Sequence, residues 1–255
     1  MAWNIVRHAF VIVFGNWREA LRASVIPFVI SIALIAVMLT VTGVPLQTNI
    51  GLNLEEIANP GAIFVVVLAS LALMMFTFSW VAVTWHRFIL LEEYPANVPV
   101  VADRPIGAYL RRTLMIVLQM MAFVVPLSFV IMPILIGLLE NPVMLAIVSI
   151  AFNVLLSYVW LRVSVSLPSV AVGQPMGSID AWAKTSHISQ TILGTALIMI
   201  VLNFVASMVF SLALGPIPII STIASLAVQW ISMMVGISVL TTIYGHVIEG
   251  RPLVD

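Results

Sequence analysis

The sequence contains no cysteine, and only 8% of its 255 residues are charged. Without cysteine the chain cannot form a disulfide, a thiolate metal site, an iron–sulfur cluster or a cysteine nucleophile. Soluble domains carry about 25% charged residues, whereas 62% of this chain is hydrophobic. A soluble fold of this length could not bury so much apolar surface, so lipid must be the solvent for much of it. The formal net charge is zero, and the chain therefore lacks the basic excess that a nucleic-acid partner would require.

Six apolar segments are long enough to cross a membrane, because a helical span needs roughly 20 mostly apolar residues. They cover residues 23–43, 62–84, 113–138, 143–166, 191–213 and 218–243. Backbone groups in hydrocarbon must be paired internally, and these segments lack the period-two alternation of barrel strands. The sequence therefore predicts an all-α integral membrane protein with six transmembrane helices, which form a single membrane domain over residues 1–255.

All ten lysine and arginine residues flank the predicted spans on one side of the membrane. They are Arg7, Arg18, Arg22, Arg87, Arg104, Arg111, Arg112, Arg162, Lys184 and Arg251. The opposite side carries Glu55, Glu56 and Glu140 and no cation. The positive-inside rule assigns the basic side to the cytoplasm, and an even number of spans then places both termini there. No small-residue cleavage site follows the short apolar run at residues 9–15, so we expect no cleavable signal.

An amphipathic stretch at about residues 2–20 precedes the first span. Its aromatic and aliphatic side chains, Trp3, Val6, Phe10, Val13, Phe14 and Trp17, share one helical arc. This pattern predicts an interfacial helix that lies flat on the membrane, with its aromatic residues at the depth of the lipid headgroups.

Two further stretches of this kind precede the third and fifth spans. One begins near residues 103–105 and continues to Arg112, and the other begins at Ser178 and carries Trp182 and Lys184. We therefore predict three helical hairpins, each preceded by a cytoplasmic interfacial amphipathic helix. The corresponding repeat units are residues 1–100, 101–173 and 174–255. The alternative is that aromatic and basic residues recur at these places only because they mark most membrane boundaries.

Four polar residues lie inside the predicted spans: Gln119, Asn153, Asn203 and Gln229. They could line a polar pathway, or they could form interhelical hydrogen bonds worth about 0.6–2 kcal/mol each. We favour the second interpretation, because a transport path usually adds an ionisable residue at mid-depth. Arg162 is the deepest charge, and its long side chain is expected to reach the cytoplasmic interface that Trp160 marks.

His86 and His246 lie at equivalent ends of the second and sixth spans and are the candidates for binding a metal, a haem or a pigment. Interfacial histidines without a ligand are common, and neither forms a helical metal-binding motif with a carboxylate. We therefore predict no cofactor and no metal. The sequence also lacks the common hydrolase, phosphate-loop, zinc-protease and dinucleotide-binding motifs, and we predict that the protein is not an enzyme.

The basic side offers candidates for binding lipid headgroups. They are Arg7, Arg18, Arg22, Arg111, Arg112 and Lys184. Anionic lipid attracts a cation near the membrane surface by about 1 kcal/mol. The alternative is that these residues only set the topology.

The layout resembles a known group of proteins. An amphipathic stretch leads into a proline-bearing start of the first span at residues 22–28, and the second span ends in Trp85–His86–Arg87 before Glu92–Glu93. Three hairpins complete the pattern. This resembles uncharacterised bacterial inner-membrane proteins grouped with the membrane domain of glycerophosphodiester phosphodiesterases. The resemblance implies a multi-pass protein of the bacterial cytoplasmic (inner) membrane, with no known catalytic residues in this part. The phosphodiesterase catalytic domain itself is absent from this sequence, so we do not expect its activity.

The predicted function is that of a non-enzymatic inner-membrane protein. It would act through contacts of its cytoplasmic face with membrane lipid, with another membrane protein or with further copies of itself. The alternative is a small-solute transporter or channel with a polar path near Gln119, Asn153 and Asn203.

Overall fold

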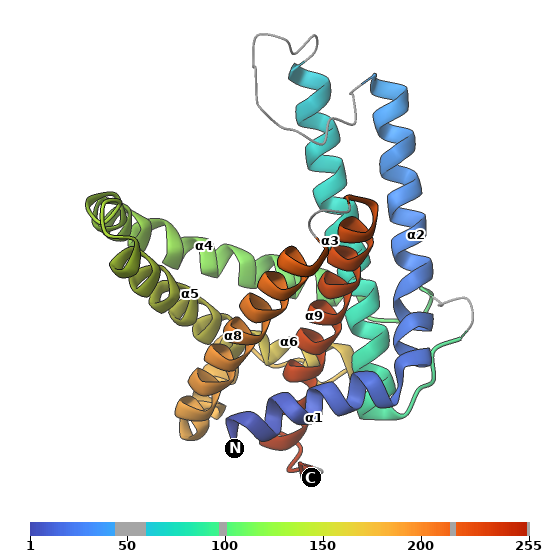
Figure 1. The fold of residues 1–255 in the computed structure, drawn as a ribbon. Coiled ribbons are helices and arrows are strands. Elements are labelled where there is room, and N and C mark those ends of the chain that lie inside the picture. Colours follow the sequence, from blue (N-terminus) through green and yellow to red (C-terminus); the bar gives the residue numbers. More distant parts are fainter. Residues whose placement is uncertain (44–59, 97–100, 215–217, 254–255) are drawn as a thin grey trace.

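A computed structural model describes residues 1–43, 60–96, 101–214 and 218–253, and every regular element within these ranges is a helix (Figure 1). Six helices are long and apolar enough to cross a membrane. They are α2 (Trp17–Thr42), α3 (Pro60–Leu91), α4 (Ile106–Gly137), α5 (Pro142–Ser164), α8 (Ser189–Leu214) and α9 (Pro218–Val247). The all-α fold with six potential transmembrane helices is thus confirmed, and the chain is an integral membrane protein.

Four shorter elements accompany the long helices: α1 (Ala2–Gly15), α6 (Ser166–Ala171), α7 (Ser178–Lys184) and a 3₁₀ turn, η2 (Ser186–Ile188). The structure does not describe residues 44–59, which include Glu55 and Glu56, or residues 215–217 between the last two predicted spans. Glu140 lies in the described turn between α4 and α5.

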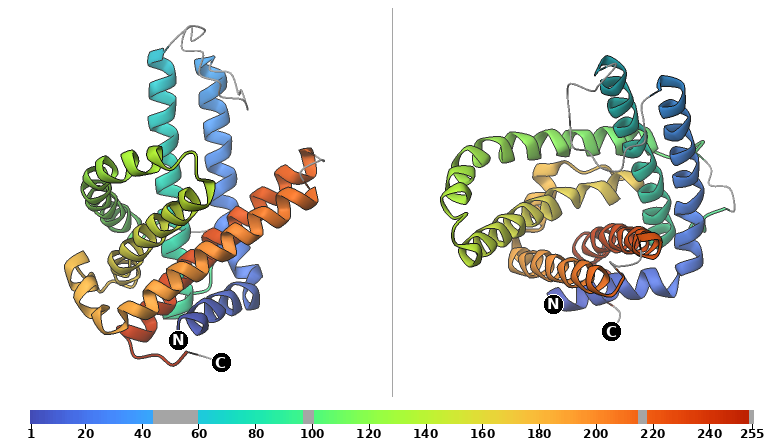
Figure 2. Two further views of the ribbon diagram at one scale, coloured as in Figure 1. Left: turned by 60° about the vertical axis from the view of Figure 1, so that its left-hand side comes forward. Right: turned by 45° about the horizontal axis from the view of Figure 1, so that its top comes forward.

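The long helices form three antiparallel pairs, in which α2 packs on α3, α4 on α5, and α8 on α9. Figures 1 and 2 show that the pairs diverge from a common region near both termini and point in different directions. At the ends that meet in this common region, the helices are longer than the predicted spans, because they continue past the apolar segments into a packed protein core. For example, α3 extends to Leu91 and α9 to Val247.

We call this shared region the base, and define it as α1, α6 and α7 together with the adjoining ends of the six long helices. The largest fully buried side chains gather here and include Trp85, Ile116, Ile192 and Tyr244. The outer parts of the three pairs expose most of their apolar side chains, as expected for surfaces that face lipid.

Helix α1 belongs to the protein core on one face. It packs against α8 and α9, and Ile5, Ala9 and Val13 are fully buried. A Cβ atom at Gly194 would lie 3.0 Å from the Cβ of Ala2, so glycine allows α1 to approach α8 closely. The prediction that Val6 and Val13 share the membrane-facing arc was therefore wrong, because both are buried against the protein. The aromatic flank with Trp3, Phe14 and Trp17 remains exposed.

The structure also corrects the predicted interfacial helices. Helix α1 is separate and ends before Asn16, whose side-chain amide donates to the Ile12 carbonyl, and α7 is also a separate helix. The stretch before the third span is instead the first part of α4, which runs unbroken from Ile106, because no helix-breaking residue follows Gly107 until Pro126. Helix α6 was not predicted.

Candidate functional site

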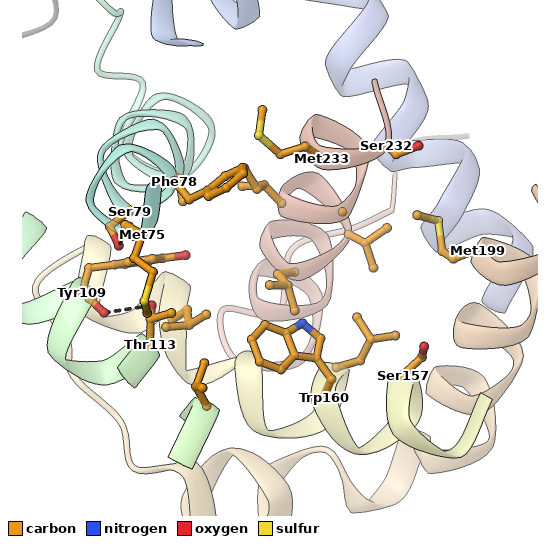
Figure 3. A pocket seen from close by; sticks show the side chains of 18 of the residues that line it. Met75, Phe78, Ser79, Tyr109, Thr113, Ser157, Trp160, Met199, Ser232 and Met233 are labelled. Carbon is orange, nitrogen blue, oxygen red and sulfur yellow. Dashed lines mark hydrogen bonds between the residues drawn. The ribbon is translucent and has the colours of Figure 1, made fainter. Parts of the chain in front are cut away.

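A pocket of about 520 Å³ lies where the three helix pairs meet. Helices α3, α4, α5, α6, α8 and α9 all contribute to its wall. Figure 3 shows Phe78, Tyr109, Trp160, Met199 and Met233 around it. Its volume falls in the range of small-molecule sites, about 300–1,000 Å³.

The polar groups around this pocket are mostly occupied by bonds within the protein. The Ser79 hydroxyl donates to the Met75 carbonyl at 2.8 Å, and the Thr113 hydroxyl donates to the Tyr109 carbonyl at 3.0 Å (Figure 3). The Ser232 hydroxyl donates to the Asn203 side chain at 2.6 Å. The side chains of Ser157 and Trp160 also line the pocket and have no hydrogen-bond partner in the described part of the chain. No charged residue lines the pocket, so it is suited to a mostly apolar group.

A buried histidine beside the pocket joins three helices. The single hydroxyl proton of Thr241 goes to the Ile237 carbonyl at 2.9 Å, so its oxygen must accept from the His86 Nδ1–H at 2.8 Å. This leaves His86 Nε2 unprotonated, and it accepts from the Tyr109 hydroxyl at 3.2 Å. The neutral His86 ring therefore connects α3 with α9 and α4.

These bonds bear on the two histidines that were candidates for cofactor binding. Both ring nitrogens of His86 are occupied, and a metal could bind only if one hydrogen bond were lost. His246 belongs to a different network, since its Nδ1 donates to the Arg251 carbonyl at 2.9 Å. Within the described ranges, no group of three or more histidine, aspartate or glutamate side chains could hold a metal ion.

The four intramembrane polar residues do not converge on one path. Asn203 joins α8 to α9 through Ser232, which is the interhelical hydrogen bond that we favoured. Asn153 donates to the Ser149 carbonyl in its own helix at 2.8 Å. Gln119, Asn153 and Gln229 lie on exposed helix surfaces, and none of the four lines the central pocket.

Six of the ten cations are held by neighbouring side chains or carbonyls. Arg22 lies 3.8 Å from Glu19 and Arg18 lies over the Trp17 ring. The other four form ion pairs or hydrogen bonds: Arg87, Arg104, Arg162 and Arg251. The remaining four have no hydrogen-bond or ion-pair partner in the described part of the chain: Arg7, Arg111, Arg112 and Lys184. The headgroup candidates therefore divide into four free cations and two, Arg18 and Arg22, that already have partners.

Arg162 differs from the prediction. Its side chain is buried, with 5% of the residue exposed, and does not extend to the interface. Its guanidinium donates to the Thr185 hydroxyl at 3.1 Å, to the Tyr158 hydroxyl at 2.9 Å and to the Trp182 carbonyl. It also lies 3.8 Å from the centroid of the Trp182 ring. Arg162 thus fastens α7 and the turn after it to the end of α5.

Arg87 and Glu93 form an ion pair at the base. Arg87 Nε donates to Glu93 at 2.8 Å, and another guanidinium nitrogen donates to the Ala171 carbonyl at the end of α6 at 2.9 Å. Arg104 lies 3.9 Å from the same carboxylate. The hydrogen bond from Arg87 lowers the pKa of Glu93 below its ordinary value of 4.5, and the charges of Arg87 and Arg104 add to this effect.

This depressed pKa predicts an acid-sensitive contribution to stability. A carboxyl group with a lower pKa in the folded state stabilises the fold above its unfolded-state pKa, and the contribution is lost as the pH falls through the folded-state pKa. We therefore expect the Glu93→Gln variant to melt at a lower temperature than the wild type at neutral pH, and the difference to shrink as the pH falls below 4.5.

The matched control for this measurement is Glu92→Gln. The Glu92 side chain is exposed and forms no ion pair within the described ranges. Melting curves in one detergent at several pH values should show little effect of this substitution. A difference between Glu93→Gln and the wild type that stays constant with pH would contradict the assignment.

Comparison with known proteins does not assign the chain to a family. The chain has no significant match among protein-family models, curated proteins or solved structures. The resemblance to bacterial inner-membrane proteins therefore stays a prediction.

Proposed function

We propose that this protein is a non-enzymatic inner-membrane protein that works through contacts between its basic, cytoplasmic face and anionic membrane lipid. The observation that supports this best is the set of four free cations, Arg7, Arg111, Arg112 and Lys184. The fold engages the other six cations in hydrogen bonds, ion pairs or stacking on an aromatic ring, whereas these four are left for an external partner.

The surface of the base suits an anionic membrane surface. Each cation near such a surface is attracted by about 1 kcal/mol. On α1 the aromatic flank is exposed, with 57% of Trp3 and 52% of Phe14 accessible, and aromatic side chains favour the depth of the headgroups. Arg7, Trp3 and Phe14 belong to the same short helix, so one orientation of α1 on the membrane would place all three at the interface.

The experiment compares lipids retained by the purified protein. Native mass spectrometry of protein from membranes that contain phosphatidylglycerol and phosphatidylethanolamine should show preferential retention of phosphatidylglycerol. A variant with glutamine at all four free positions should lose this preference, because about 4 kcal/mol of attraction is removed. Equal retention of the two lipids by the wild type would contradict the proposal, and so would a stoichiometric protein partner without bound lipid.

The competing hypothesis is a small-solute transporter or channel. Its proposed path included Gln119 and Asn153, which lie on exposed helix surfaces away from the central pocket. It still predicts solute flux in proteoliposomes that falls in the Asn203→Leu variant. We favour the lipid-binding proposal, because all four free cations belong to elements of the base, whereas Gln119 and Asn153 lie on exposed helix surfaces outside the central pocket.

A further inference from the structure

A second pocket, of about 410 Å³, lies between the first turns of α4 and the end of α6. Helix α4 contributes Arg111, Arg112 and Met115, and the opposite wall includes Val170 and Gly173. Two cations thus line this pocket, and no acidic side chain does. The central pocket lies on another face of α4, with Tyr109 and Thr113 in its wall.

The protein itself supplies no anion for these two arginines. The obvious acceptors opposite them are the four last carbonyl groups of α6, and all four already have donors. The backbone amides of Val172, Gln174 and Gly173 donate to the carbonyl groups of Pro168, Ser169 and Val170, respectively. The Arg87 guanidinium donates to the Ala171 carbonyl. Arg111 and Arg112 are therefore not needed to cap α6, and they have no other partner in the described part of the chain.

We propose that this pocket binds the phosphate group of an anionic phospholipid. Guanidinium groups match phosphate oxygens in geometry and charge, and adjacent arginines can each donate to the same phosphate. Met115 and Val170 give the pocket an apolar wall, which suits the start of the acyl chains. Arg111 is exposed and Arg112 is half-buried, so a headgroup can reach both from the membrane surface.

This inference rests on the proposed lipid-binding function and narrows it from a whole face to one site. A lipid without net charge carries its own cation beside the phosphate, and this cation would lie close to two arginines in the pocket. The site should therefore prefer phosphatidylglycerol over phosphatidylcholine. Free phosphate has the same chemistry but lacks the apolar part, so the two sources can be separated by experiment.

The test is a titration of the detergent-purified full chain with short-chain phosphatidylglycerol, short-chain phosphatidylcholine or inorganic phosphate, followed by the shift in melting temperature. For the wild type we expect saturable stabilisation by phosphatidylglycerol and much weaker effects of the other two. The double variant Arg111→Gln/Arg112→Gln should weaken the apparent affinity for phosphatidylglycerol by at least about tenfold.

The matched control is the double variant Arg18→Gln/Arg22→Gln, which removes the same charge from the same side of the protein. It should keep the wild-type affinity within about twofold. The ligand-free melting temperature shows whether each variant is folded, and Arg111→Lys/Arg112→Lys should retain part of the affinity. If the two glutamine variants lost affinity equally, or if phosphate bound as tightly as the lipid, the site assignment would be overturned.

The outcomes also separate this inference from the function on which it rests. A wild type without preference for phosphatidylglycerol would contradict the proposed function. A wild type with that preference, which Arg111→Gln/Arg112→Gln retains in full, would leave the proposed function standing and refute this site.

Discussion

Replacing Arg162 by alanine is expected to lower the free energy of unfolding by about 3 kcal/mol, the scale of a lost hydrogen bond to a charged group and the unpaired groups left behind. The substitution removes the donor to Thr185, Tyr158 and the Trp182 carbonyl and the stacking on the Trp182 ring. Because α7 is short and depends on this contact, it should detach from α5. Unfolding in sodium dodecyl sulfate, followed by tryptophan fluorescence, measures the loss.

Two comparisons isolate the role of the Arg162 guanidinium. Arg162→Lys retains the charge but cannot donate in the same fork, so it should recover only part of the stability. Arg7→Ala removes an exposed cation without a described partner and should change the free energy of unfolding by less than about 0.5 kcal/mol. An Arg162→Ala variant as stable as Arg7→Ala would mean that the side chain snorkels, as the sequence had suggested.

Replacing Trp85 by alanine should destabilise the protein by about 3–5 kcal/mol, as for other large-to-small substitutions in a core. Trp85 is fully buried and its indole N–H donates to the Ser238 hydroxyl at 2.8 Å, which joins α3 to α9. Its removal leaves a cavity in the packed core of the base. The same unfolding assay measures the effect.

The control for this prediction is Trp17→Ala at the start of α2. Trp17 is 51% exposed, so its loss should change stability by less than about 0.5 kcal/mol in detergent. Trp85→Phe should lie between the two, because it keeps the ring and loses the hydrogen bond to Ser238. Equal effects of Trp85→Ala and Trp17→Ala would contradict a core located at the base.

The six spans could be predicted because hydrocarbon imposes length and apolarity on each helix separately. A stretch such as residues 191–213 needs no partner to be recognised as a span. The amphipathic pattern was enough to predict a helix before the first span. It did not indicate which face of α1 packs against the rest of the protein. Ile5 and Ala9 lie in the core and Trp3 is exposed, and this choice depends on α8 and α9.

The polar contacts of the base could not be predicted, because they join residues far apart in the chain. Arg162 and Thr185 are 23 positions apart, and His86 and Thr241 are 155 apart. Hydropathy ranks Arg162 and Arg111 alike as cations at the end of a span. Only the tertiary structure shows that Arg162 forms hydrogen bonds within the protein and that Arg111 has no partner in the described part of the chain.

The central proposal is that the base, with its free cations, faces the cytoplasm and that the connections within the three helix pairs face the other side. Because the chain has no cysteine, single-cysteine variants report one position each. Asn4→Cys on α1, Ser186→Cys on η2 and Glu140→Cys between α4 and α5 are all at exposed positions. In intact spheroplasts, a membrane-impermeant maleimide should label Glu140→Cys at once and the other two only after the membrane is permeabilised. Labelling of Asn4→Cys or Ser186→Cys in intact spheroplasts would contradict the claim.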